Sequence, residues 1–136
     1  MRLFIRISIF IALFFSTIAA NNFQSKIEIS LKKDEQKKIL VKYDSIEKLF
    51  TLRWTLYHNK GLVVFRSYDK AVAQNVLYLR QKSRSFMVKL RPSGKEYLNP
   101  PYFFVRFKDF NYEKHEAVFE IFLRDKASEI EFEELN

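Results

Sequence analysis

Residues that could carry out nucleophilic or metal chemistry are few and isolated in this sequence. The chain of 136 residues contains two histidines, His58 and His115, and no cysteine. A catalytic zinc ion needs three protein ligands, and its histidine ligands usually stand close together in the sequence. His58 falls at the mouth of a predicted turn without a partner that would make it a base, so we expect it to be exposed to solvent. The sequence therefore predicts no metal site.

The serines and glycines give no stronger indication of catalysis. Ser67, Ser83 and Ser85 lie outside any G-x-S-x-G pattern, which would place a nucleophilic serine on a sharp turn. The two glycines, Gly61 and Gly94, are too few for a loop that holds phosphate through several backbone amides. A small hydrolase with a pair of carboxylates stays open as an alternative, because acidic residues are numerous. We nevertheless expect no catalysis and no cofactor.

Basic residues gather between positions 80 and 95, a segment without any acidic side chain. If Phe86, Val88 and Leu90 point into the core, the residues between them point outward, and Tyr78 joins them from the preceding strand. A basic strip beside a ring suits a polyanion, because the cations pair with phosphates or carboxylates and the ring stacks. An ordinary solvated face would explain the same residues. The candidate binding residues of this strip are Tyr78, Arg80, Lys82, Arg84, Lys89, Arg91 and Lys95.

The most aromatic run of the chain, residues 102–110, is apolar on both of its faces. Phe103, Val105 and Phe107 alternate along one face. The other face carries Tyr102, Phe104 and Phe110. Such two-sided apolarity predicts a central strand, and it makes Tyr102 and Phe104 candidate residues for docking onto another protein.

The first twenty residues have the composition of a secretory signal peptide. Arg2 and Arg6 form a positive start, residues 7–15 are apolar or small, and small side chains follow. Cleavage after Ala19 or after Ala20 fits this pattern. An uncleaved anchor is the alternative, although the apolar segment is shorter than the roughly 20 residues that span a bilayer. We therefore expect a periplasmic or secreted protein that is not a stable transmembrane protein unless the leader is retained.

The charge of the chain is uneven. The net charge is +8 overall, but residues 125–136 contain five acidic residues and one lysine. Residues 21–124, which remain when the predicted leader and this acidic segment are left out, are therefore more basic than the chain as a whole. Such a charge favours encounters with polyanions.

Alternation of apolar and polar residues dominates the remaining sequence, which we treat as one domain over residues 21–136. Trp54 and Leu56 are expected on one buried face of a strand that ends before the turn at residues 59–61. In that turn we expect Gly61 to adopt a left-handed conformation and close a bulged hairpin. A short helical turn is possible over residues 44–47. The predicted strands cover residues 27–31, 39–43, 50–57, 62–68, 76–80, 85–91, 102–110, 117–123 and 129–135.

This number of short strands predicts an all-β fold. We expect an antiparallel β-sandwich of about eight strands, immunoglobulin-like in architecture only, with a closed barrel as the alternative. The chain has 48% hydrophobic and 17% aromatic residues, enough to form a core without disulfides.

Three functional hypotheses follow from these patterns. The first is a noncatalytic module that docks onto another cell-envelope protein. The second is a polyanion-binding protein that recognises nucleic acid, anionic glycan or lipopolysaccharide through residues 80–95. The third is the small hydrolase. Oligomeric state is not predicted by the sequence.

Overall fold

The computed structural model of the chain describes residues 26–90, 101–123 and 130–136. The predicted signal peptide over residues 1–20 and its cleavage sites lie outside these residues. The same is true of Arg91 and Lys95, and of the turn expected at residues 92–94.

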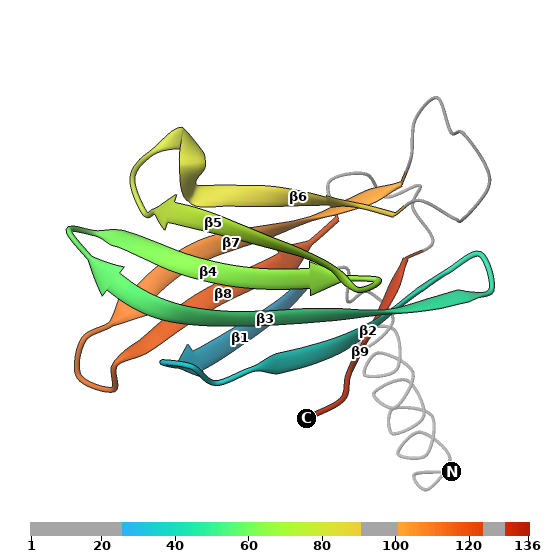
Figure 1. The fold of residues 1–136 in the computed structure, drawn as a ribbon, viewed down its shortest axis with the longest axis horizontal. Coiled ribbons are helices and arrows are strands. Elements are labelled where there is room, and N and C mark those ends of the chain that lie inside the picture. The colour runs from blue at the N-terminus through green and yellow to red at the C-terminus, as the bar shows by residue number, and fades with distance from the viewer. Residues whose placement is uncertain (1–25, 91–100, 124–129) are drawn as a thin grey trace, which may run out of the picture.

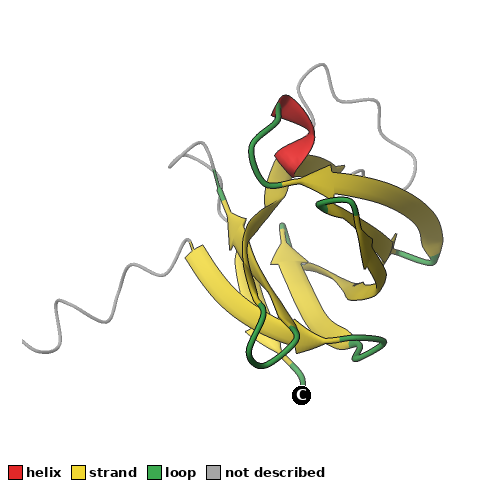
Figure 2. Ribbon diagram, turned by 90° about the vertical axis from the view of Figure 1, so that its left-hand side faces the viewer, coloured by secondary structure: helices red, strands yellow, loops and turns green. Residues whose placement is uncertain are grey.

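Two antiparallel sheets form the described part of the chain, which confirms the predicted β-sandwich (Figure 1). The four-stranded sheet has the order β1-β8-β7-β6, and the five-stranded sheet has the order β5-β4-β3-β2-β9. A view along the layers shows the two sheets facing each other (Figure 2). The elements are β1 (Lys26–Lys32), β2 (Lys37–Tyr43), β3 (Ile46–His58), β4 (Gly61–Tyr68), β5 (Ala71–Tyr78), a short 3-10 turn η1 (Lys82–Arg84), β6 (Ser85–Lys89), β7 (Tyr102–Asn111), β8 (Glu116–Phe122) and β9 (Glu131–Glu134).

Strands β2 to β5 follow one another as three hairpins with two-residue turns. Both residues of each turn have positive φ, and this geometry matches the right-handed twist of the strands. The turns are Asp44–Ser45 (φ 49° and 61°), Asn59–Lys60 (50° and 64°) and Asp69–Lys70 (48° and 69°). The possible helical turn at residues 44–47 is therefore wrong, because a tight hairpin turn leads directly into β3.

Gly61 does not have the role that we expected from the sequence. It is the first residue of β4 and pairs with His58, so the turn contains two residues rather than three. A Cβ atom at position 61 would lie 3.0 Å from the ring of Tyr78 on the neighbouring strand. A side chain at this position would therefore require the Tyr78 ring to shift by a few tenths of an ångström.

The core lies between the sheets and consists of alternate residues from both. Phe50 of β3 and Phe103 of β7 meet edge to face across it, with ring centroids 5.2 Å apart. Trp54 is 3% exposed, and its indole N–H donates to the Leu31 carbonyl at 2.7 Å, which confirms its expected place in the core. Burying side chains of this size contributes about 1.5–3 kcal/mol each. The fold is therefore stabilised by burial, since the chain has no cysteine.

Two β-bulges change which residues face the core. The pairing of β3 with β4 shifts between Trp54 and Leu56, and that of β7 with β8 shifts between Phe107 and Asp109. A bulge inserts one residue into a strand and reverses the facing of the residues that follow it. Leu56 is therefore exposed, and Phe110 is buried, both contrary to the sequence prediction. Tyr57 now turns inward and stacks on Phe110, with centroids 4.1 Å apart.

Two strands, β7 and β9, occupy the positions in their sheets that their sequences predict. β7, aromatic on both faces, lies between β6 and β8. β9 pairs only with β2 among the described residues, and its alternate glutamates point away from the core, as expected for an edge strand.

Candidate interaction surfaces

The outer face of the five-stranded sheet carries most of the exposed apolar side chains of the described chain. Cross-strand pairing aligns Leu56, Val63 and Val76 in one row across β3, β4 and β5. Val72, at 75%, is the most exposed of the large hydrophobic residues that the structure describes. We define the outer apolar face as Leu49, Leu56, Val63, Phe65, Val72 and Val76.

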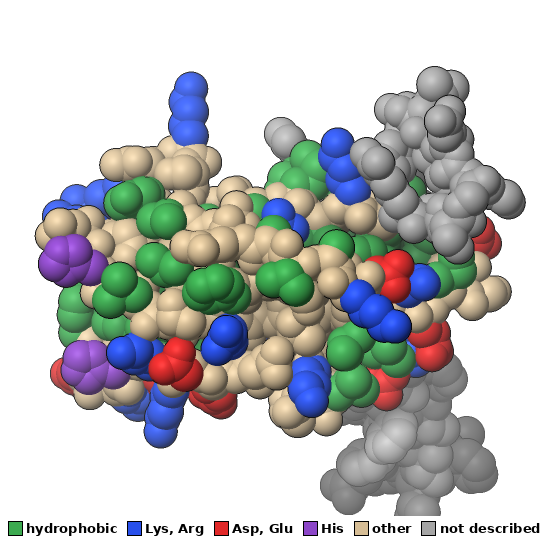
Figure 3. All heavy atoms as spheres, viewed as in Figure 1, with side chains coloured by type: hydrophobic (Ala, Val, Ile, Leu, Met, Phe, Trp, Pro, Cys, Tyr) green, Lys and Arg blue, Asp and Glu red, His purple; other side chains and the backbone are tan. Residues whose placement is uncertain are grey.

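Hydrophobic side chains gather on this face in the space-filling view, with basic side chains among them (Figure 3). The Arg53 guanidinium lies over the Phe65 ring, 5.2 Å from its centroid. In the row beyond Arg53 and Phe65, the hydroxyl groups of Thr51 and Ser67 form a hydrogen bond of 2.5 Å. The outward face of an antiparallel sheet is ordinarily polar, so this apolar row is a candidate contact surface.

The predicted basic strip is divided between the two sheets. Tyr78 lies at the end of β5, whereas Lys89 lies on β6, and these strands belong to different sheets. The expectation that both share one outer face is wrong, because outer faces of the two layers point in opposite directions. Arg80 and Lys82 are exposed near η1, between the two strands.

Arg84 is held by the fold rather than presented to solvent. Its guanidinium donates to the carbonyls of Phe107 and Lys108 at 2.8 and 3.0 Å. These carbonyls belong to the bulge in β7, where the pairing with β8 is interrupted. Arg84 thus supplies hydrogen bonds that the bulge removes from the ladder.

Tyr102 and Phe104 lie on the outer face of the four-stranded sheet. Their ring centroids are 5.4 Å apart, and the Phe104 ring stacks on Phe122 at 5.5 Å. Met87 pairs with Phe104 across the strands, and Lys89 pairs with Tyr102. Both aromatic residues are half-buried, and Met87 beside them is exposed.

Glu120 is a buried carboxylate on the same face, with a side chain only 2% exposed. Lys26 approaches it at 2.9 Å and Lys108 at 3.4 Å, and Arg106 binds its other oxygen. Burial alone would raise the pKa of Glu120, but hydrogen bonds from these three cations and the charge of Arg106 outweigh burial and hold it at about 2. Lys108 also binds Glu28 at 2.7 Å.

The two carboxylates that share Lys108, Glu120 and Glu28, do not supply the chemistry of a glycosidase. Such a site needs one carboxylic acid whose pKa is raised so that it can donate a proton. The pKa of Glu120 is lowered instead, and a lysine lies between Glu120 and Glu28. In the described residues, histidines and acidic side chains do not gather in a group of three that could hold a metal ion.

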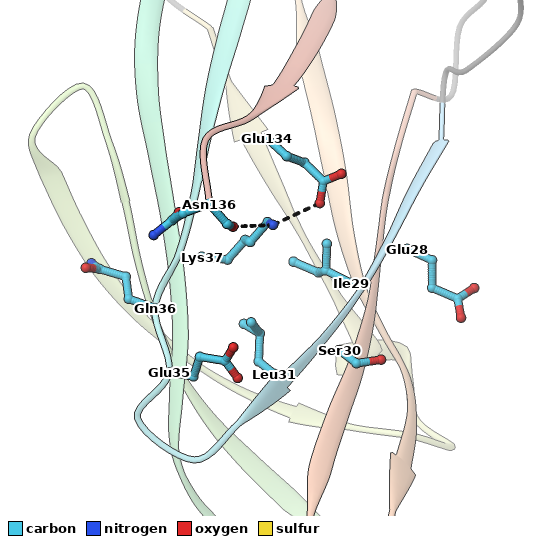
Figure 4. A pocket seen from close by; sticks show the side chains of 9 residues that line it. All are labelled: Glu28, Ile29, Ser30, Leu31, Glu35, Gln36, Lys37, Glu134 and Asn136. Atoms are coloured by element: carbon cyan, nitrogen blue, oxygen red, sulfur yellow. Dashed lines mark hydrogen bonds and ion pairs between the residues drawn. The ribbon is translucent and has the colours of Figure 1, made fainter. Parts of the chain in front are cut away.

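A groove of about 370 Å³ opens between β1 and the C-terminal strand β9 (Figure 4). Ile29 and Leu31 point into it from β1. The ammonium group of Lys37 lies in its mouth, 3.0 Å from Glu134 and 2.5 Å from the backbone carbonyl of Asn136. The chain's own lysine and tail thus occupy the opening.

The outer apolar face was missed by sequence reasoning for two reasons. The bulge in β3 moves Leu56 to that face, and β5 begins at Ala71 rather than at Val76. The residue pair Asp69–Lys70 could have indicated the earlier start, since it follows β4 as Asn59–Lys60 follows β3.

Comparisons with known proteins leave the family of this chain undefined: no family model, curated protein or solved structure matches it. Within the part of the chain that the structure describes, no helix is long and apolar enough to cross a membrane.

Proposed function

We propose that this protein is a noncatalytic, exported interaction module of the periplasm that docks onto another cell-envelope protein through the outer apolar face. The observation that carries the proposal is the row formed by Leu56, Val63 and Val76, together with the exposed Val72. The proposed export rests on the signal-peptide pattern of residues 1–20.

Positive charge on the chain favours a partner with acidic side chains. Arg53 lies within the face, and without Arg2 and Arg6 of the leader the chain still has 22 basic against 16 acidic residues. An apolar protein surface with an acidic rim would complement both features, since opposite charges at the rim steer association.

Replacement of an exposed residue of the face tests this proposal. Leu56→Glu places a charge in the outer apolar face, and the monomer should tolerate it because Leu56 is 51% exposed. Met87→Glu is the matched control, since Met87 is also exposed but lies on the opposite sheet. The assay is chemical crosslinking in intact cells of the source organism, followed by mass spectrometry and by binding measurements with the purified partner.

We expect one envelope protein to crosslink to the unchanged chain and to the Met87→Glu variant, but not to the Leu56→Glu variant. Binding of the purified partner should weaken at least about tenfold for Leu56→Glu, because a charge would be buried in an apolar contact. Equal crosslinking of both variants would contradict docking through this face.

Polyanion binding is the second candidate function, and it now has fewer residues to support it. Arg80, Lys82 and Lys89 are exposed, whereas Arg84 is bound to β7 carbonyls. This function predicts binding to heparin or lipopolysaccharide that falls steeply as salt rises. The same titration on Arg80→Gln and Lys82→Gln variants would show whether the exposed cations contribute.

A further inference from the structure

The edge strand β5 differs from the other edge strands in having no charged side chain. Its sequence, residues 71–78, is AVAQNVLY, and it pairs only with β4 among the described residues. Natural sheets protect their edges with charges, prolines or bulges, because an edge presents unpaired backbone N–H and C=O groups. The other edges follow this rule: β1 and β9 each carry three charged residues, and β6 carries Lys89. β5 lacks all three devices.

The outward side chains of β5 are open to solvent. Val72 and Val76 are 75% and 42% exposed, and Gln74 between them is also exposed. On the inner side, the Asn75 side chain accepts a hydrogen bond of 2.8 Å from Arg66 of β4. This bond and the continuous ladder with β4 hold β5 in an extended conformation that a further strand can join.

We propose that β5 pairs with β5 of a second copy of this chain, antiparallel and centred on Gln74. A register that keeps each face continuous must pair residues of the same face. Centring on Gln74 does so: Gln74 lies opposite its own copy, and Val72 lies opposite Val76 of the second copy. On the inner face, Ala73 lies opposite Asn75 of the second copy.

The charge pattern favours a second copy as the occupant. At a two-fold axis a residue meets its own copy, so a charged residue there would repel itself, whereas two amides can hydrogen-bond. Without Arg2 and Arg6 of the leader, the chain has 22 basic and 16 acidic residues, so two copies repel each other, and a contact surface that contained cations would add to this repulsion. β5 itself carries no cation: Lys70 and Arg80 lie beyond its two ends, and the nearby Arg66 of β4 lies on the inner side, where it is bound to Asn75.

This pairing would join the two five-stranded sheets into one continuous sheet. The row Leu56–Val63–Val76 then continues into Val72 of the second copy. The outer apolar faces of the copies thereby become one surface of twice the extent.

A charge-swap experiment at the two-fold axis tests the dimer. The purified chain, produced with its own leader, is analysed by sedimentation equilibrium, alone and as Gln74→Lys and Gln74→Glu variants. We expect the unchanged chain to have twice the mass of one copy. Each variant alone should dissociate at least about tenfold more readily, because like charges meet. An equimolar mixture of the two variants should regain the dimer mass, since lysine then faces glutamate.

Two further variants keep the test decisive. Val72→Lys should also weaken the dimer, and the high exposure of Val72 makes a loss of monomer folding an insufficient explanation. Ser30→Lys is the control variant, because Ser30 is exposed on a different edge strand, β1. This variant should keep the dimer mass of the unchanged chain. A monomeric unchanged chain would overturn the proposal. The proposal would also be overturned if both Gln74 variants remained dimers, or if the equimolar mixture of the two variants remained monomeric. None of these outcomes depends on an envelope partner, so the dimer and the proposed function can fail separately.

Discussion

The carboxylate of Glu120 should contribute a large share of the stability of this fold at neutral pH. Its pKa is held at about 2, against 4.5 for an unperturbed glutamate. One pKa unit corresponds to 1.36 kcal/mol, so the difference amounts to about 3 kcal/mol. Domains of this size are stable by only about 5–15 kcal/mol in total. We therefore expect Glu120→Gln to lower the free energy of unfolding by about 3 kcal/mol at pH 7.

The pH dependence has a definite direction. Because the folded-state pKa is lowered, the contribution of Glu120 is complete above the unfolded-state value of 4.5 and is lost as pH falls toward 2. The unchanged chain should lose stability through this window. The Glu120→Gln variant should lose about 3 kcal/mol less over the same window, since it has no carboxylate to protonate at this position.

The assay is urea unfolding at a series of pH values. Trp54 is the only tryptophan and is buried in the core, so its fluorescence reports unfolding of both sheets. Glu28→Gln is the matched control, because the Glu28 side chain is half-exposed and, among the described residues, forms an ion pair with Lys108 only. An exposed ion pair contributes at most about 1 kcal/mol. Equal stability of the unchanged chain and Glu120→Gln at pH 7 would refute the reasoning, as would parallel losses between pH 5 and pH 2.

Three further predictions concern the turns and the bulge. Lys60→Gly should raise the free energy of unfolding by about 1 kcal/mol, because glycine adopts the positive φ of this turn without steric cost. Urea unfolding measures this gain in stability, and an unchanged free energy of unfolding would contradict the prediction. Gly61→Ala should lower stability by about 1–3 kcal/mol through a clash with the Tyr78 ring, and the loss should shrink in a Tyr78→Leu background. Arg84→Ala should cost about 2 kcal/mol, because two carbonyls at the β7 bulge lose a charged donor. The exposed neighbour provides the control, since Lys82→Ala should change stability by less than about 0.5 kcal/mol.

Much of the fold could be predicted from local patterns. Period-two alternation located most strands, and the aromatic run at residues 102–110 correctly indicated a central strand. Trp54 was correctly placed in the core. These predictions succeeded because burial on one face of a pleat imposes a period that the sequence displays directly.

The predictions failed where the period is interrupted or where strands change sheets. Leu56 and Phe110 were assigned to the wrong faces, because a bulge is a property of pairing between two strands. The basic strip was assembled on one face because β5 and β6 are consecutive in the chain, although they belong to opposite sheets. Arg84 was expected to bind a ligand, but it meets carbonyls more than twenty residues away in the sequence.

The sequence by itself determined the all-β class, the composition of the core and the uncharged character of residues 71–78. Each of these follows from the types and spacing of neighbouring residues, which fix what a local segment can bury. Only the tertiary structure decided which outer face is apolar, which strands are edges and which cations surround Glu120. These features depend on register and sheet order, since they bring together side chains that are distant along the chain.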